Sequence, residues 1–223
     1  MTGWYSVAST AADPAEEGRR EADRAAAANR ARYDAAAAPV VAELAAAGFA
    51  VDTIGELRGS GRRYTAAIPV LVKWLPRATY DGVRGDIVDS LGVPWAPAAA
   101  PALIAEFRRA QPGSGPGRRW SIAAALAESA TDDVIDEIVE LVRDRGYGDD
   151  RQMLALALGR MRDPRAVDVL LDLGREGDLA GHVAIALGRL RAAAARPLLE
   201  DLARHPVPWV RREAAKALKR IER

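Results

Sequence analysis

The stretch LALALGRMRDPRAVDVLLDL at residues 154–173 returns 29 positions later as VAIALGRLRAAAARPLLEDL at residues 183–202. Ten of the twenty aligned positions are identical, and four more exchange one apolar residue for another. Self-similarity at a period of roughly 30 residues is typical of stacked helical repeats. The chain is therefore predicted to be all-α, an α-solenoid in which each unit buries its apolar face against the next.

The leucine of the Ala-Leu-Gly motif, together with its counterparts, sets the phase of the repeat. This marker leucine falls at Leu91, Leu126, Leu158, Leu187 and Leu218, with spacings of 35, 32, 29 and 31. Four of these units carry another apolar residue 12 positions later. Alanine alternates with larger residues around the motif, and alanine is a strong helix former but a poor strand former. Each unit is therefore predicted to contain a first helix with the marker leucine, a tight turn and a second helix.

Two kinds of turn residue support this division into helices. Gly92, Gly159 and Gly188 each follow the marker leucine, where a helix that ends in a left-handed residue favours the absence of a Cβ. Asp163 and Pro164 then supply an N-cap acceptor and a proline for the first helical position. We therefore expect the second helix of that unit to begin next to this pair.

The ends of the array differ from its middle. Residues 13–64 are expected to form an N-terminal helical cap, with one long helix, or two joined at Pro39, over residues 13–47. Residues 65–223 are expected to form the solenoid, packed with the cap as one continuous domain, and residues 1–12 a disordered tail. The polar residues at 209–223 suit a closing helix that faces water on one side.

The composition excludes several functional classes. The chain has no cysteine, so disulfides, thiolate nucleophiles and cysteine-based metal sites are excluded. It has no uncharged apolar run long enough to span a membrane, and its first residues lack the pattern of a secretory signal. We therefore expect a cytoplasmic protein. The 29 arginines against 3 lysines, with abundant alanine, suggest a GC-rich bacterial genome.

The units at residues 151–173 (RQMLALALGRMRDPRAVDVLLDL) and 209–221 (WVRREAAKALKRI) resemble HEAT repeats of the short bacterial type. Repeats of this type are also found in phycobilin lyase subunits, and the resemblance extends over residues 65–223. It implies a non-catalytic scaffold or adaptor that binds another protein without a cofactor. It also implies that the second helices line the concave surface.

Five carboxylates recur at two equivalent positions of the second helices. They are Asp136, Glu140, Asp168, Asp172 and Asp201. On a concave face they would form an acidic ladder that suits a protein partner or a basic peptide. An ordinary solvated helix surface explains the same pattern equally well. The oligomeric state and the identity of the partner do not follow from the sequence.

A second charged set follows the turns, with Arg160, Arg162, Arg189 and Arg191 as a possible basic edge. Such a row would contact phosphates, although arginines at these places more often neutralise helix C-termini. An acidic groove would also repel a nucleic-acid duplex. Nucleic-acid binding, a DNA glycosylase-like activity and a bilin lyase-like chaperone are therefore lower-ranked alternatives.

Catalytic and metal-binding patterns are not found. The two histidines, His182 and His205, fit a packed helix and an inter-repeat turn, and no hydrolase, zinc-protease or P-loop motif occurs. The acidic pairs at 132–133 and 149–150 suit helix caps better than a metal site. We expect no catalytic residues. Trp95 and Trp209 lie beside prolines, where they suit either the seam between units or a partner interface.

Overall fold

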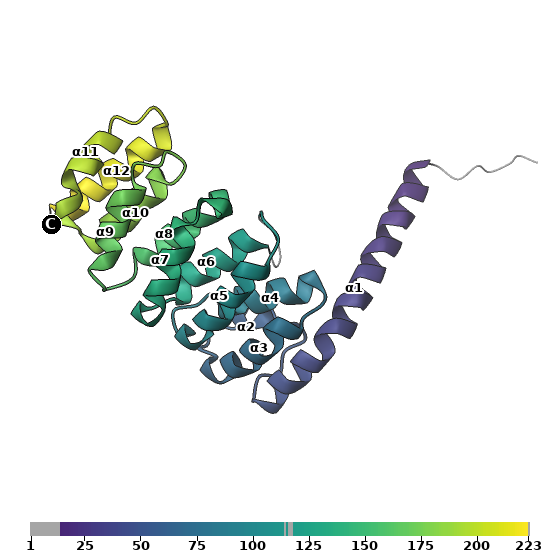
Figure 1. Ribbon diagram of the computed structural model, residues 1–223. Helices are drawn as coiled ribbons and strands as arrows, with labels where there is room; N and C mark the ends of the chain where they lie inside the picture. The colour runs from purple at the N-terminus through teal and green to yellow at the C-terminus, as the bar shows by residue number, and fades with distance from the viewer. Residues whose placement is uncertain (1–13, 114, 116–117, 223) are drawn as a thin grey trace, which may run out of the picture.

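A computed structural model describes residues 14–113, 115 and 118–222; the tail expected at residues 1–12 lies outside these described residues. In this part of the chain the structure contains twelve α-helices, short 3-10 turns and no strand. Figure 1 shows a curved array of helix pairs with one long helix standing away at its N-terminal end. The all-α solenoid predicted from the repeat is confirmed.

The five marker leucines all lie in the row of first helices. These are α4 (Asp81–Leu91), α6 (Arg119–Ser129), α8 (Arg151–Leu158), α10 (Ala180–Leu190) and α12 (Pro208–Ile221). The second helices are α3 (Ile68–Trp74), α5 (Ala100–Arg109), α7 (Ile135–Arg143), α9 (Arg165–Leu173) and α11 (Arg196–Leu202). The short α2 (Glu56–Gly59) precedes α3, and α1 (Pro14–Ala46) opens the described chain. Four marker leucines are fully buried, so the repeat phase coincides with the core.

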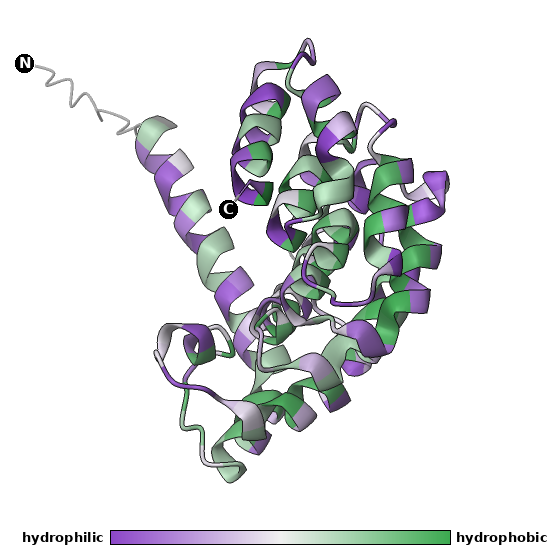
Figure 2. Ribbon diagram, turned by 90° about the vertical axis from the view of Figure 1, so that its left-hand side faces the viewer, coloured by the Kyte–Doolittle hydropathy of each residue, from purple (hydrophilic) through white to green (hydrophobic). Residues whose placement is uncertain are grey.

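Consecutive first helices pack more closely than consecutive second helices do. Small residues explain this close approach, since a Cβ on Gly159 would lie 2.6 Å from the Cα of Ala186. A Cβ on Gly188 would lie 2.9 Å from the Cα of Ala217. Because one row is spaced more closely than the other, the ribbon curves toward the first helices. We call the surface of this row the inner face, and Figure 1 shows α1 on the same side. In the turned view of Figure 2, the long helix that follows the grey trace again stands apart from the array.

The structure gives these glycines a different role from the one predicted. Gly92 has φ −76° and Gly159 has φ −66°, and Gly188 is absent from the glycines with positive φ. The prediction that a left-handed conformation selects them was therefore wrong. They lack a Cβ because the backbone of the next unit approaches them closely, a cause that lies outside their own unit. At the end of α10 the left-handed residue is Arg191, with φ 51°.

A recurring arginine joins four of the five first helices to the segment before them. It lies seven positions before the marker leucine in four of the five units, and the remaining unit has Ala180 there. The bonds run from Arg84 to the carbonyl of Ala78 (2.6 Å), Arg119 to Ala110 (2.7 Å), Arg151 to Val142 (3.1 Å) and Arg211 to Pro206 (2.8 Å). The first three arginines thus satisfy a carbonyl at or just beyond the end of the preceding helical segment, where helical partners are missing, and Arg211 satisfies one in the loop after α11.

The C-terminal part of α1 anchors it to the array. Val40 and Leu44 are buried, and α1 packs on α3 and α4. Glu43 accepts a hydrogen bond from Nε1 of Trp74 at 3.0 Å and pairs with Lys73; the bond from Lys73 is the main cause that lowers the pKa of Glu43. The long helix expected here is a single one that continues through Pro39. Nearly all of its residues before position 33 are exposed.

Candidate functional site

The inner face presents one stripe of mostly accessible residues on each of the four first helices α6, α8, α10 and α12. Stripe residues are spaced i, i+3 and i+7, which places them on one side of a helix. They are Ser121, Ala124 and Glu128 on α6; Met153 and Leu156 on α8, with Arg160 in the turn after it; His182, Ile185 and Arg189 on α10; and Glu213, Lys216 and Arg220 on α12. Other sides of these helices pack on their neighbours. The stripes are therefore the surface that a partner entering the curve would meet.

The centre of the inner face is apolar. Trp120, Ala124, Met153 and Ile185 are half-buried, and Leu156 is 9% exposed. A hollow of about 250 Å³ opens between α4, α6 and α8. Trp120, Ala124 and Met153 line it, whereas Leu156 and Ile185 lie outside its lining. We call these five residues the inner patch. Apolar side chains beside a hollow are the usual anchoring points for a partner residue.

Charges are separated toward the two ends of the inner face. On α4, Asp86 accepts a hydrogen bond from the hydroxyl of Tyr33, and Asp89 lies 3.9 Å from Arg58. Burial raises the pKa of Asp89, an effect that nearby Arg58 partly offsets. Burial, followed by the bond to Asp86, raises the pKa of Tyr33. The negative end of the inner face therefore lies where α1 crosses α4.

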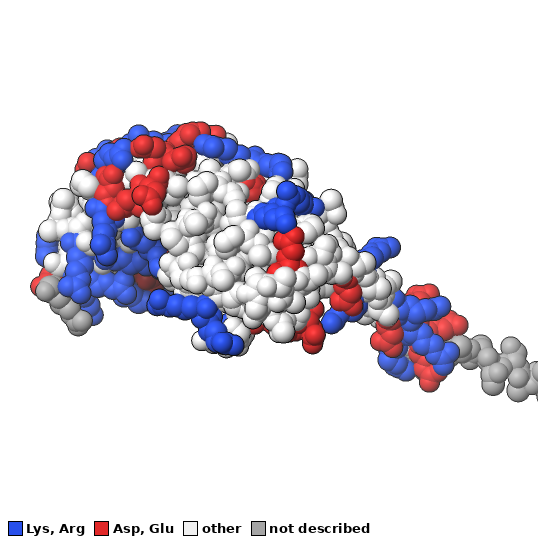
Figure 3. All heavy atoms as spheres, turned by 90° about the horizontal axis from the view of Figure 1, so that it is seen from below, with Lys and Arg blue, Asp and Glu red and all other residues white. Residues whose placement is uncertain are grey.

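The opposite end of the inner face is positive. Arg189, Lys216 and Arg220 are exposed on α10 and α12. Lys216 pairs with Glu213 at 2.7 Å, whereas Arg189 and Arg220 make no salt bridge within the described residues. Figure 3 shows the molecule from below: at the end that holds the last helices, many basic side chains gather beside a smaller acidic group, and a broad area without charges adjoins them. The charge of the molecule is thus unevenly distributed despite a net charge of only +1.

The predicted acidic ladder lies on α7, α9 and α11, in the outer row. Most of its members are paired with arginines. The pairs are Asp136–Arg165 (2.6 Å), Glu140–Arg108 (2.9 Å), Asp172–Arg143 (3.6 Å) and Asp201–Arg204 (2.6 Å), and Asp168 is exposed. The first three pairs join successive second helices. The structure thus differs from the resemblance, which implied that second helices form the inner face. Binding of a basic partner by these carboxylates stays a prediction.

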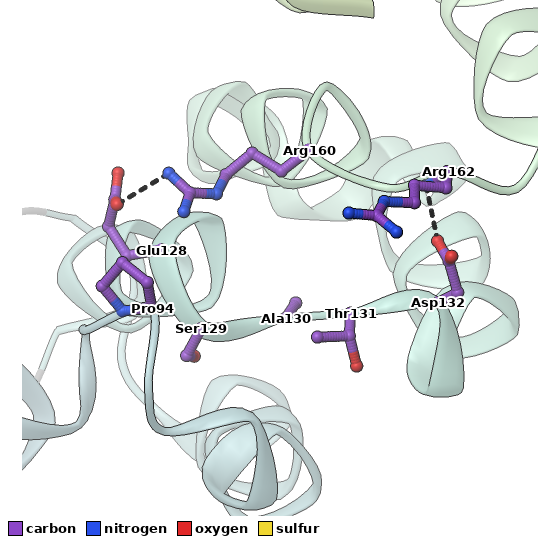
Figure 4. Close-up of a pocket in the computed structure, with 8 residues that line it drawn as sticks. All are labelled: Pro94, Glu128, Ser129, Ala130, Thr131, Asp132, Arg160 and Arg162. Carbon is purple, nitrogen blue, oxygen red and sulfur yellow. Dashed lines mark hydrogen bonds and ion pairs between the residues drawn. The ribbon is translucent and has the colours of Figure 1, made fainter.

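The turns between first and second helices carry the predicted basic edge. In Figure 4, Arg160 and Arg162 from the turn after α8 lie across a hollow of about 330 Å³ from the turn after α6. Arg160 pairs with Glu128 at 2.9 Å. The backbone N–H of Arg162 donates to Asp132 at 2.7 Å. Asp132, expected to cap its own helix, therefore holds the turn of the next unit instead.

Three of the four predicted edge arginines surround one further hollow. Arg160, Arg162 and Arg189 line it, with a volume of about 640 Å³, between the turns after α8 and α10. Arg191 is exposed at the end of α10. The neighbouring Asp163 accepts the backbone N–H of Arg165 at 2.9 Å, as an N-cap residue does. Three of the four arginines thus lie around one hollow, and carboxylates hold the turn after α8 in place. Binding of phosphates by this edge stays a prediction.

The two histidines and Trp209 make structural contacts. The ring of His182 lies edge-on to Trp209, with 5.3 Å between ring centroids, and the indole covers Gly181 so closely that a Cβ there would lie 1.9 Å from it. Trp209 therefore fills the seam between α10 and α12. Nδ1 of His205 accepts the backbone N–H of Val207 at 3.2 Å, as expected for a turn residue.

The second proline-flanked tryptophan also packs within the array. Trp95 lies edge-on to Tyr64 with 5.6 Å between ring centroids, and the guanidinium of Arg63 lies over its ring. In the acidic pair at 149–150, Asp150 is buried and forms a salt bridge with Arg119 at 3.7 Å. Within the described ranges, no cluster of three or more metal-ligating side chains is placed to hold an ion. In the same part of the chain, no helix has the length and hydropathy needed to cross a membrane.

The half-buried imidazole of His182 predicts a pH dependence of stability. Burial lowers the pKa of His182 below its ordinary value of 6.5, so the folded chain binds fewer protons there than the unfolded chain just below that pH. The free energy of unfolding should therefore fall as the pH drops through 6.5. The variant His182→Gln should lack this component. Urea unfolding of both proteins at neutral and mildly acidic pH checks it, and an identical pH slope in the two would contradict it.

Comparison with known families agrees with the geometry of the last five helices. Residues 150–173 match the PBS lyase HEAT-like repeat, and residues 175–223 match HEAT repeats. These matches confirm the resemblance read from the sequence over α8 to α12. No curated protein matches the chain, and no solved structure does.

Proposed function

We propose that this HEAT-repeat protein is a non-catalytic scaffold that binds a partner protein along its inner face. A repeat array divides its core between units and presents an extended curved surface. The observation that carries the proposal is the inner patch: α6 and α8 place Trp120, Ala124 and Met153 around one hollow, and Ile185 of α10 continues the apolar surface beside it. An apolar centre within a charged surround is the ordinary anatomy of a protein interface.

The outer row supports this choice by contrast. Its prominent charged groups are already paired with one another between units, as in Glu140–Arg108 and Asp136–Arg165. Exposed ion pairs of this kind add little to stability or binding. The inner patch instead leaves half-buried apolar area next to the hollow, and removing such area from water favours association.

Nucleic-acid binding along the basic edge is a second candidate, which the clustering of Arg160, Arg162 and Arg189 favours. Two observations rank it lower. Glu128 already neutralises Arg160, and the inner face ends in Asp86 and Asp89, which would repel a long polyanion.

The double variant Met153→Glu with Ile185→Glu tests the proposed surface. It places two carboxylates on the inner patch, so the partner recovered by affinity capture from the native host should fall by about tenfold or more, as for loss of a binding hot spot. The matched control is Val139→Glu with Leu171→Glu, which changes two half-buried apolar residues of the outer row. Thermal unfolding establishes that both variants are folded. Equal recovery with the two variants would contradict the proposal.

A further inference from the structure

We infer that the partner segment is polarised: an apolar stretch that covers the inner patch, followed by an acidic end that lies over α10 and α12. This inference rests on the proposed function and adds the chemistry of the ligand. It is argued from the charge of the two ends of the inner face and from the order in which the first helices bring the three surfaces together.

The positive end is open to a ligand. Arg189 and Arg220 are exposed and have no carboxylate partner within the described residues. The two arginines lie on neighbouring helices and close to each other. A Cβ on Gly188, the residue before Arg189, would lie 3.7 Å from Cδ of Arg220. α12 adds to this field, since it contains five basic residues and one acidic residue. Charges of one sign on adjacent helices attract an oppositely charged segment and orient it during encounter.

The order of surfaces along the array gives the segment a direction. Asp86 and Asp89 lie on α4, the inner patch spans α6, α8 and α10, and the positive end continues onto α12. An acidic residue placed over α4 would meet Asp86 and Asp89, although Arg58 lies 3.9 Å from Asp89. The same residue over α12 would meet Arg220, which has no carboxylate partner within the described residues. A segment with one acidic end therefore binds in one orientation only.

The same order argues for a peptide rather than a nucleic acid. A nucleic acid would carry negative charge over the whole face, including the carboxylates of α4, and would leave the inner patch without apolar contact. A segment that is negative at one end and apolar beside it satisfies both surfaces. The negative charge of the ligand is thus expected only in the part that lies over α10 and α12.

A peptide selection on the purified full chain tests this inference. A phage library of random peptides, about 20 residues long so as to cross several helices, is selected at low salt. Enriched peptides are synthesised and their dissociation constants are measured by fluorescence anisotropy. We expect aspartate and glutamate to group at one end of the enriched sequences, next to apolar residues. For these peptides, Arg189→Glu with Arg220→Glu should weaken binding by about tenfold or more, with stronger salt dependence in the wild type.

The control variant is Arg62→Glu with Arg175→Glu, which produces the same change in net charge at exposed arginines outside the inner stripes. It should bind the peptides as the wild type does. Enriched peptides without an acidic end, or acidic peptides that bind the Arg189→Glu/Arg220→Glu variant and the control equally, would overturn the inference. If those peptides still lose binding to the Met153→Glu/Ile185→Glu variant, the proposed function stands.

Other outcomes of the same experiment would contradict the proposed function as well, or would assign the positive end to a nucleic acid. Peptides that bind the Met153→Glu/Ile185→Glu variant as well as the wild type, or no enrichment at all, would overturn both the inference and the proposed function. A labelled single-stranded oligonucleotide of random sequence is measured in parallel. If the oligonucleotide binds and responds to reversal of Arg189 and Arg220 while the peptides do not, the positive end belongs to a nucleic-acid surface and the inference is wrong.

Discussion

Replacing Gly159 by alanine is expected to lower the free energy of unfolding by about 1–3 kcal/mol, the range for overpacking a close contact. The local backbone preference alone predicts a rise in the free energy of unfolding, because alanine at a glycine site with negative φ commonly stabilises a protein by about 0.4–1 kcal/mol. The neighbouring unit decides the outcome. The new Cβ would lie 2.6 Å from the Cα and 2.7 Å from the Cβ of Ala186, so α10 would have to move away from α8.

Gly59→Ala is the matched control for this substitution. Gly59 ends α2, does not have a positive φ, and a Cβ there would meet nothing within 4 Å. We expect its free energy of unfolding to stay the same or to rise slightly. Denaturant unfolding of the wild type and both variants provides the measurement. A Gly159→Ala variant as stable as the control would show that the first helices are not in close contact.

Arg151→Ala is expected to cost about 2–3 kcal/mol, less than the roughly 3–5 kcal/mol for breaking a fully buried ion pair, because the partner Glu176 is 20% exposed. The side chain of Arg151 is 2% exposed and lies 2.6 Å from Glu176. It also donates to the carbonyl of Val142, so it connects the end of α7 with the turn after α9. Its loss would leave Glu176 and that carbonyl without their main partner. Burial works to raise the pKa of Glu176, but Arg151 and Arg145 together lower it.

Arg145→Ala offers an internal control because it removes a second arginine from the same carboxylate. The side chain of Arg145 is 78% exposed and lies 3.2 Å from Glu176. An exposed pair of this kind contributes about 0–1 kcal/mol. Equilibrium unfolding in urea should therefore separate the two variants clearly. Equal losses of stability would mean that the buried arginine does not hold the units together.

Much of the fold could be predicted from the period alone. The marker leucines place every first helix correctly, because this position packs into the core in each unit and is fully buried in four of the five. The role of Gly159 could not be read in the same way, since the atom that excludes a Cβ belongs to Ala186 in the next unit. The recurring arginine represented by Arg151 was missed, although its constant distance from the marker leucine was visible in the sequence.

The candidate site was harder to predict than the fold. Carboxylates in phase with the repeat drew attention to the second helices, but their charge is balanced by arginines of adjacent units. The partners in Asp136–Arg165 are 29 residues apart and those in Glu140–Arg108 are 32 apart, close to one repeat length. This spacing was the available signal. Which row faces inward depends on the packing distance between units, and no single unit contains that information.

Site-specific photo-crosslinking in the native host tests the central claim most directly. A photoreactive residue is placed at Met153 on the inner patch, or at Leu171 on the outer row, both half-buried positions of the array. We expect a discrete adduct with a partner protein from the Met153 position and none from the Leu171 position. An adduct from the outer row alone, or the same adduct from both positions, would contradict binding along the inner face.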